Sequence, residues 1–431
     1  MNYFSLHQQS PVVDFRDATL QGQAPDKGLY FPQSIPVFEK DFIFHIESLS
    51  PAEIAFRVMR PYTGNTIPEE DLLRIVSETI GFPFPLVDIT GSIASLELFH
   101  GPTLAFKDVG ARFMSRCLGY FSRDTDKKTT VLVATSGDTG GAVANGFLGV
   151  DGVDVVILYP SGKVSPVQEL QLTTCGQNIT ALEVDGSFDD CQAMVKDAFM
   201  DASLMTHRKL TSANSINVAR WLPQQLYYLF AWRQWKDKDH PPVISVPSGN
   251  FGNLCAGLLA HCSGLPVKQF IAACNANDAV VDYLNTGRYA AKKAVATLSN
   301  AMDVGSPSNF VRILQLFQND HHLVAQKIKG YSVSDAQTKE TIAKVYRATG
   351  YTLDPHGAVA YHALQEYQEN NPLEKGLILE TAHPVKFPET VEAATGAQIP
   401  VPDSARELFG REKKSIRINP EFSALKEFLF S

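Results

Sequence analysis

Two stretches decide the fold expected for this chain: TVLVATSGDTGGA at residues 130–142 and VISVPSGNFGNLCAG at residues 243–257. Each begins with a short apolar run, continues through a glycine-rich turn, and ends in residues typical of a buried helix. Continuous apolar strands that alternate with helices indicate parallel sheets covered on both faces. Both stretches therefore predict strand–turn–helix units of an α/β protein, which binds ligands where its strands end.

Further apolar runs outside these stretches extend the pattern. They are Asp154–Tyr159, Ile179–Val184, Phe270–Cys274 and Leu377–Leu379. The first 90 residues differ, because Ser50–Pro51 and Pro68–Asp71 have the composition of helix starts. We predict a mainly helical N-terminal module followed by α/β lobes with parallel sheets.

Composition limits the class of protein. The 431 residues include 38 Lys+Arg and 46 Asp+Glu, a formal charge of −8, with 44% hydrophobic residues. At roughly 150 residues per domain this length suggests two or three globular domains, and the acidic balance argues against a nucleic-acid partner. The six cysteines form no CxxC pair, and the chain has neither a signal peptide nor a long apolar run. We therefore expect reduced thiols, a cytoplasmic location and no membrane partner.

Familiar nucleotide and metal motifs are absent from the sequence. No two glycines are separated by one residue, so the dinucleotide motif GxGxxG is missing, and so are GxxxxGK[ST], GxSxG and HExxH. We expect no metal site. What remains is the turn Ser248–Leu254, where Gly249 and Gly252 would let the backbone approach an anion at a helix start. The alternative is a tight turn that binds nothing.

A second candidate is the lysine in HGPTLAFKD at residues 100–108. Lys107 lies among Leu104, Phe106 and Val109. Desolvation lowers the pKa of a lysine and makes its amine a nucleophile for carbonyl carbon. The alternative is an ordinary lysine whose stem lies along the surface of a helix.

Taken together and in order, several segments resemble the threonine synthases over about residues 12–400. They are GLYFPQSIP (28–36), HGPTLAFKDVGARF (100–113), ATSGDTGGA (134–142), ANSINVARWLPQ (213–224), VPSGNFGNLCAG (246–257), TLSNAMDVGSPSN (297–309), LDPHGAVA (353–360) and LETAHPVKFPETV (379–391). The resemblance implies a pyridoxal-phosphate enzyme of the tryptophan-synthase-β fold group (fold type II), with the cofactor in the cleft between two α/β lobes. It implies conversion of O-phospho-L-homoserine and water to L-threonine and phosphate.

The same resemblance suggests the domain boundaries. We expect a helical N-terminal module at 1–90 and a small α/β domain at 111–221. The large cofactor-binding domain would comprise 91–110 and 222–395, with a helical insertion at about 275–330, and a C-terminal tail would follow at 396–431. The oligomeric state is expected to be monomer or homodimer.

The resemblance also assigns site residues. Lys107 matches the lysine that forms the Schiff base, and Thr381 the hydroxyl residue facing the pyridine nitrogen. The cofactor phosphate would be held by Ser248, Gly249, Asn250, Phe251, Gly252 and Asn253. The amino-acid end of the substrate would lie on Ser136, Gly137, Asp138 and Thr139, and its phosphate on Asn214, Ser215 and Arg220. Asp138 is also expected near the 3′ oxygen of the cofactor, where many relatives carry Asn.

Some alternatives stay open at this point. Arg220 could be a surface arginine on a capped helix, and His356, His383 and Lys386 are weaker candidates for the cleft. A related phospho-lyase would yield a 2-oxo acid and ammonia instead of threonine. A non-catalytic sensor of a phosphorylated metabolite would keep the anion sites but would not need Lys107.

Overall fold

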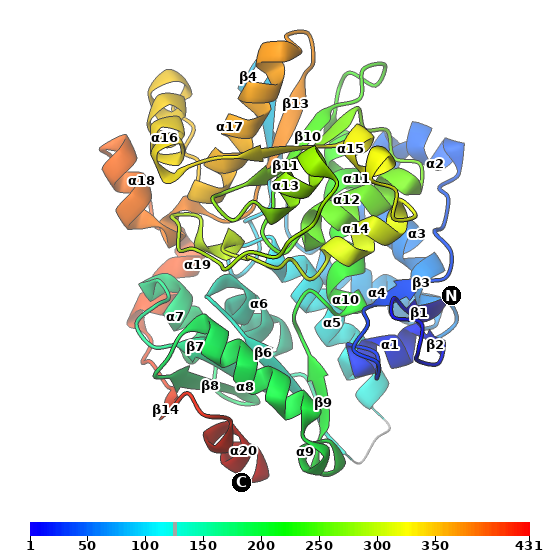
Figure 1. Ribbon diagram of the computed structural model, residues 1–431, viewed down its shortest axis with the longest axis vertical. Coiled ribbons are helices and arrows are strands. Elements are labelled where there is room, and N and C mark those ends of the chain that lie inside the picture. Colours follow the sequence, from blue (N-terminus) through cyan, green and yellow to red (C-terminus); the bar gives the residue numbers. More distant parts are fainter. Residues whose placement is uncertain (124–126) are drawn as a thin grey trace.

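The computed structural model describes residues 1–123 and 127–431 and has two separate lobes (Figure 1). The first lobe is built on a six-stranded sheet of order β12-β11-β10-β13-β5-β4, in which all neighbours are parallel except β4 and β5. Its strands are β4 (Leu86–Thr90), β5 (Ile93–Glu97), β10 (Val243–Pro247), β11 (Gln269–Cys274), β12 (Ile328–Ser332) and β13 (Gly376–Glu380). The predicted runs at 243, 270 and 377 form three central strands of this sheet.

The second lobe is built on a parallel five-stranded sheet of order β14-β8-β7-β6-β9. Its strands are β6 (Thr129–Ala134), β7 (Val153–Pro160), β8 (Ile179–Val184), β9 (Lys209–Ser212) and β14 (Ile416–Ile418). The edge strand β14 comes from the predicted C-terminal tail, and the apolar helix α20 (Phe422–Phe430) packs its Leu425 and Leu429 against this lobe. The end of the tail, from β14 onward, is therefore part of the second lobe.

The N-terminal region lies beside both lobes (Figure 1). It contains the helices α1 (Phe15–Gln21), α2 (Lys40–Phe44), α3 (Pro51–Thr63) and α4 (Glu69–Thr79). The predicted start of α3 is confirmed, since Ser50 and Glu53 cap it reciprocally. The region also contains a small antiparallel sheet that was not predicted: β1 (Asn2–Ser5), β2 (Val13–Asp14) and β3 (Tyr30–Pro32).

Helices cover the sheets of both lobes. On the first lobe they are α11 (Gln225–Gln234), α12 (Gly252–Cys262), α13 (Ala279–Thr286), α14 (Phe310–Leu316), α15 (His321–Lys327), α16 (Asp335–Thr349), α17 (Pro355–Asn370) and α18 (Pro388–Thr395). On the second they are α6 (Asp138–Phe147), α7 (Pro166–Thr173), α8 (Phe188–Met200) and α9 (Ala202–His207), with the short α19 (Asp403–Arg406) between the lobes. The expected insertion at 275–330 is helical at α13, α14 and α15, irregular across 287–298, and ends in the unpredicted strand β12.

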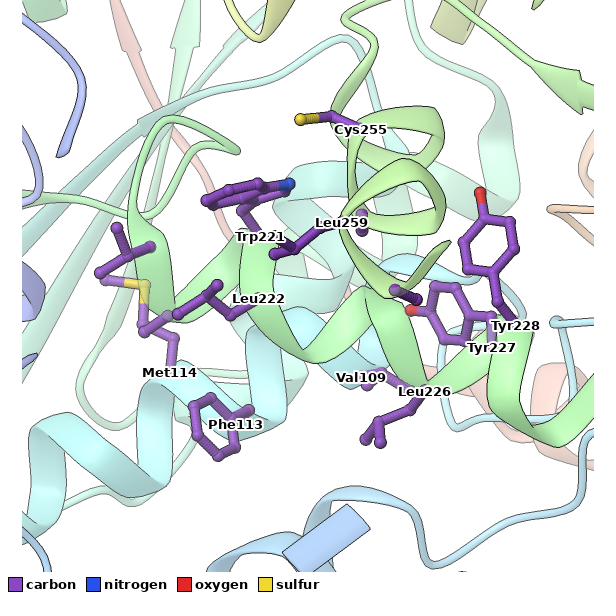
Figure 2. Close-up of a cluster of buried hydrophobic side chains, with 14 of the residues drawn as sticks. Val109, Phe113, Met114, Trp221, Leu222, Leu226, Tyr227, Tyr228, Cys255 and Leu259 are labelled. Atoms are coloured by element: carbon purple, nitrogen blue, oxygen red, sulfur yellow. The ribbon is translucent and has the colours of Figure 1, made fainter. Parts of the chain in front are cut away.

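The lobes meet along the helices α5 (Lys107–Ser122) and α10 (Val218–Trp221). Figure 2 shows the buried core at this junction, where side chains of α5, α10, α11 and α12 come together. Among them are Phe113 and Met114 of α5, Trp221 of α10 and Leu259 of α12, all fully buried. Because this core is continuous under both lobes, it fixes the start of α5 relative to the turns after β6 and β10.

Within the described ranges, no helix is long and apolar enough to cross a lipid bilayer.

Candidate active site

A cavity of about 1380 Å³ lies where the two glycine-rich turns face each other. Most of the candidates from the sequence line it: Lys107, Ser136, Asp138, Thr139, Asn214, Ser215, Arg220, Gly249, Asn250, Phe251, Gly252, Asn253 and Thr381. These residues come from five separate parts of the chain. The fold therefore brings together the groups that the sequence singled out, with Gly137 and Ser248 in the same two turns.

Lys107 is the first residue of α5, and the loop that precedes it is hydrogen-bonded to the residues that follow β13. The Phe106 N–H donates to the carbonyl oxygen of Thr381 at 2.9 Å, and the His383 N–H donates to that of Leu104 at 3.0 Å. Leu104 has φ +58°, a left-handed conformation that is costly for a leucine and persists only where surroundings enforce it. These contacts hold Lys107 and Thr381 on one wall of the cavity.

The side chain of Lys107 is largely buried, with 16% of its surface exposed. Its Nζ lies 3.3 Å from Oδ2 of Asp138 and 5.0 Å from the ring centre of Phe106. Desolvation lowers the pKa of the Lys107 amine, the Asp138 carboxylate opposes this shift, and the cations Lys386 and Arg220 add to it. The arrangement favours a neutral, nucleophilic amine, as the apolar sequence around Lys107 predicts.

The turn after β10 is shaped for an anion. A Cβ on Gly249 would lie 2.6 Å from Cα of Met302, so only glycine fits there. Phe251 adopts a left-handed conformation, φ +60°, at the N-cap of the eleven-residue helix α12. The first N–H groups of such a helix have no intrahelical partner and direct positive charge outward. Among the described residues, the buried Nδ2 of Asn253 has no hydrogen-bond partner either.

These features fit a phosphate group, because unused donors at a helix start and a backbone without side chains are what phosphate sites need. Tyr228 donates to Oδ1 of Asn253 at 2.9 Å and so orients the Asn253 amide with its free NH₂ outward. No group of three or more acidic, His or Cys side chains able to hold a metal ion occurs in the described part of the chain.

The segment 213–220 lies beside this turn and is connected to it. Ser215 Oγ accepts hydrogen bonds from Nδ2 of Asn250 at 2.7 Å and from Nδ2 of Asn309 at 3.0 Å. Arg220 is 3% exposed, donates to the Ala213 carbonyl and keeps a buried Nε with no partner in the described residues. Burial lowers the pKa of Arg220 to about 10. Arg220 is therefore a buried cation on the cavity wall and not the surface arginine of the alternative reading.

Two residues of this neighbourhood were missed or undervalued from sequence. Arg312 is fully buried and donates to the carbonyl oxygens of Ser215 at 3.2 Å and Ile216 at 2.6 Å, and to that of Tyr30 in β3. Its guanidinium carbon lies 4.4 Å from the ring centre of Trp221. Lys386 is fully buried and donates to Oδ1 of Asp138 at 2.7 Å. Neither has a local sequence signal, because each acquires its contacts from segments distant in the chain.

The remaining weak candidates, His356 and His383, act structurally in this arrangement. His356 Nδ1 lies 2.6 Å from Oδ2 of Asp354, while its Nε2 accepts the Ala301 N–H at 3.2 Å, beside Gly249. His383 accepts the N–H of Val385 and caps a short 3₁₀ helix at 384–386. His356 also lines the cavity, where it holds the backbone of Ala301 beside the 248–253 turn, and His383 caps the short helix that carries Lys386.

Comparison with known proteins agrees with this geometry. Three family descriptions match the chain: "Threonine synthase N terminus" at residues 2–80, "Pyridoxal-phosphate dependent enzyme" at 88–381 and "Threonine synthase, C-terminal" at 357–429. Threonine synthase of Escherichia coli (strain K12) is 43% identical over 432 residues, with 100% of each chain covered. That of Pseudomonas aeruginosa is 38% identical over 460 residues, covering 100% of this chain and 98% of the relative.

Solved structures give the same result. The crystal structure of threonine synthase from Escherichia coli matches with a TM-score of 0.93 at 42% identity, covering 100% of this chain and 99% of that one. The pyridoxal-phosphate-bound threonine synthase from Brucella melitensis matches with a TM-score of 0.92 at 36% identity, covering 100% and 98%. The chain belongs to the threonine synthase family, whose members are pyridoxal-phosphate-dependent lyases.

Proposed function

We propose that this chain converts O-phospho-L-homoserine and water to L-threonine and phosphate, with Lys107 as its covalent and acid–base group. The observation that carries the proposal is the hydrogen bond between Asn250 and Ser215. It joins the turn that fits a cofactor phosphate to the segment that carries Arg220. A reaction between a phosphorylated cofactor and a phosphorylated substrate requires two adjacent anion sites of this kind.

Each element of the cavity has a proposed role. The turn 248–253 holds the phosphate of pyridoxal phosphate through backbone N–H groups and the Asn253 amide. Thr381 faces the pyridine nitrogen with a neutral hydroxyl. When bound, the cofactor withdraws electrons from the substrate's Cα and so acidifies hydrogens on neighbouring carbons. Residues 136–139 hold the amino-acid end of the substrate.

Lys107 performs the proton transfers in this proposal. With pyridoxal phosphate bound, Nζ of Lys107 would hold the cofactor covalently, and the Nζ freed by the substrate amine would accept the proton from the substrate's Cα. An amine that must first bind covalently and then act as a base needs to be neutral near physiological pH. The lowered pKa of Lys107 supports both steps.

Arg220, Asn214 and Ser215 hold the substrate phosphate and then the departing phosphate ion. The planar fork of an arginine suits phosphate oxygens, and burial strengthens this interaction by excluding water. The Nε of Arg220 supports this role, because it is a buried N–H donor without a partner among the described residues. The cytoplasmic location and the monomeric or homodimeric state expected from the sequence remain proposals.

The test is to incubate the purified chain with O-phospho-L-homoserine and to follow threonine, phosphate and 2-oxobutyrate together. We expect threonine and phosphate in equal amounts and a visible absorption band that borohydride bleaches. Lys107→Ala should lose both the reaction and the absorption band. Lys128→Ala is the matched control, since Lys128 is a lysine 65% exposed and paired with Asp154. 2-Oxobutyrate and ammonia as products would instead establish the phospho-lyase, and a colourless chain that takes up no cofactor would contradict both enzymes.

A further inference from the structure

Lys386 has no exposed surface and does not line the cavity itself, but its partner Asp138 does. Lys386 follows β13 in the short 3₁₀ helix 384–386, only five residues after Thr381. Burying a charged amine is costly unless a counter-charge accompanies it, and an apolar side chain would fill this space more cheaply. The position of Lys386 therefore calls for an explanation beyond packing.

Lys386 and Lys107 share one carboxylate. Oδ1 of Asp138 accepts the Nζ of Lys386 at 2.7 Å and the Nε2 of Gln168 at 2.9 Å. Among the described residues, Oδ2 accepts only from the Nζ of Lys107, at the longer distance of 3.3 Å. Asp138 is 3% exposed, so water contributes little to this arrangement. The carboxylate is thus bound more closely to Lys386 than to the proposed nucleophile.

Charged groups from each neighbouring element determine the state of Lys107. Asp138 on α6 stabilises its ammonium form, whereas Lys386 beyond β13 and Arg220 on α10 destabilise it. On its own helix, Asp108 is buried, accepts from Thr103, and has a raised pKa because of desolvation. Around Lys107 the site therefore holds two buried cations, Lys386 and Arg220, and one well-stabilised carboxylate, an excess of positive charge suited to anionic ligands.

We propose that Lys386 is a positioning residue that neutralises Asp138, so that Lys107 is left with a weakly held carboxylate and carries its amine in the reactive neutral form. Without Lys386, the full charge of Asp138 would pair with Lys107 and favour the ammonium, which has no lone pair for a carbonyl carbon. The inference rests on the proposed function, which assigns Lys107 as the nucleophile.

The test measures how readily Lys107 loses its proton in the cofactor-free, full-length chain. Trace acetic anhydride labels neutral amines only, so mass spectrometry of the Lys107 peptide across a neutral-to-alkaline pH series gives the pKa of Lys107. For the unaltered chain we expect a pKa below the ordinary value of 10.5. Lys386→Gln, which keeps a hydrogen-bond donor for Asp138 but removes the charge, should raise that pKa by about one to two units.

Two further variants separate charge from structure. Lys386→Arg restores the cation and should return the pKa of Lys107 to that of the unaltered chain. Lys413→Gln is the matched control, because Lys413 also forms close ion pairs, with Glu169 and Glu183 at 2.7 Å each, but neither of these partners lines the cavity, whereas the partner of Lys386 does. It should leave the pKa of Lys107 unchanged.

Three results would overturn the inference. One is a Lys107 pKa that is the same in the Gln variant as in the unaltered chain, and another is the same rise in Lys413→Gln. The third is a Lys107 pKa at or above 10.5 in the unaltered chain, a result that can be measured even if Lys386→Gln does not fold. The labelling needs no substrate, so a chain that makes no threonine yet shows the shift would refute the proposed function and leave this inference standing.

Discussion

The two glycine-rich turns of the cavity follow the same plan of strand, turn and helix, yet they treat their backbone donors differently. In the turn after β6, the hydroxyl oxygen of Thr135 accepts the N–H groups of Gly137 at 3.0 Å and Gly140 at 2.9 Å. A carboxylate, Asp138, also occupies the start of α6. In the turn after β10 no carboxylate lies at the helix start, and the Asn253 amide adds a donor without a partner among the described residues.

This difference shows why glycine content alone does not identify a phosphate site. The first turn uses two of its own N–H groups internally and adds a negative charge, so it is suited to holding amines in place. The second uses the N–H of Ser248, which donates to the Ala273 carbonyl oxygen at 2.8 Å, and leaves the N–H groups that follow at the start of α12 for a ligand. We assign the phosphate to 248–253 and the substrate's amino-acid end to 136–139 because the two turns differ in which backbone N–H groups already have a partner within the protein.

The largest effect is expected from a methyl group in the second turn. Gly249→Ala places a Cβ 2.6 Å from Cα of Met302 and 3.1 Å from the Ala301 carbonyl oxygen, so the backbone must move. We expect about 100-fold weaker cofactor binding, equivalent to ~2.7 kcal/mol. Added cofactor should then no longer raise the melting temperature at concentrations that stabilise the unaltered chain.

The matched control for that variant lies in the first turn. Gly141→Ala brings its Cβ to 3.1 Å from Oε1 and 3.2 Å from Cβ of Gln171, side-chain contacts that a shift of a few tenths of an ångström relieves, whereas Gly249 meets backbone atoms. Cofactor affinity should stay unchanged, and the helix should gain up to about 1 kcal/mol in stability. Equal losses in both variants would mean that the two turns do not differ in function.

Removing the internal acceptor of the first turn should affect stability and not binding. Thr135→Val leaves two buried N–H groups without their partner, which costs about 2 kcal/mol in the free energy of unfolding measured in urea. Cofactor affinity should be the same as in the unaltered chain. If Thr135→Val instead weakened cofactor binding and left the free energy of unfolding unchanged, the assignment of the two turns would be reversed.

A smaller effect is expected at the second anion site. Arg220→Lys keeps the charge but loses the planar fork, so we expect KM for the phosphorylated substrate to rise about tenfold, ~1.4 kcal/mol. The visible absorption of the bound cofactor should not change. A variant that loses the cofactor band instead would place Arg220 at the cofactor phosphate.

The smallest effect concerns the contact that joins the two anion sites. In a double-mutant cycle of Ser215→Ala and Asn250→Ala, scored as KM for the substrate, we expect a coupling of about 1 kcal/mol, because the pair shares a 2.7 Å hydrogen bond. Additive effects would show that the cofactor turn and the 213–220 segment act independently.

The sequence predicts most of the interior strands and misses the edges, for a physical reason. It also misses the interior strand β5 (IASLE), where Ser95 interrupts the apolar run. β6, β7, β8, β10, β11 and β13 are buried and read as continuous apolar runs. β9 (KLTS) and β12 (IKGYS) contain polar residues because each lies at an edge of its sheet. The strand β14 pairs with β8 more than 230 residues earlier in the chain, which no local pattern records.

The site shows the same division. Lys107 and the 248–253 turn have local signals, an apolar neighbourhood and a pair of glycines, and the structure gives both the predicted surroundings. Asp138 was expected to contact the cofactor or substrate, and the structure shows in addition that it pairs with two lysines. That pairing depends on Lys386, which lies 248 residues further along the chain and could not be inferred from spacing.

The buried guanidinium of Arg312 has a consequence for the modularity of this protein. It ties the carbonyl oxygen of Tyr30, near the N-terminus, to those of Ser215 and Ile216 beside the reaction cavity. A shortened version without the first 80 residues would leave this cation facing a void and release one wall of the cavity. The two lobes therefore cannot be excised as a minimal catalyst, and engineering of the N-terminal region should preserve the position of the Tyr30 carbonyl.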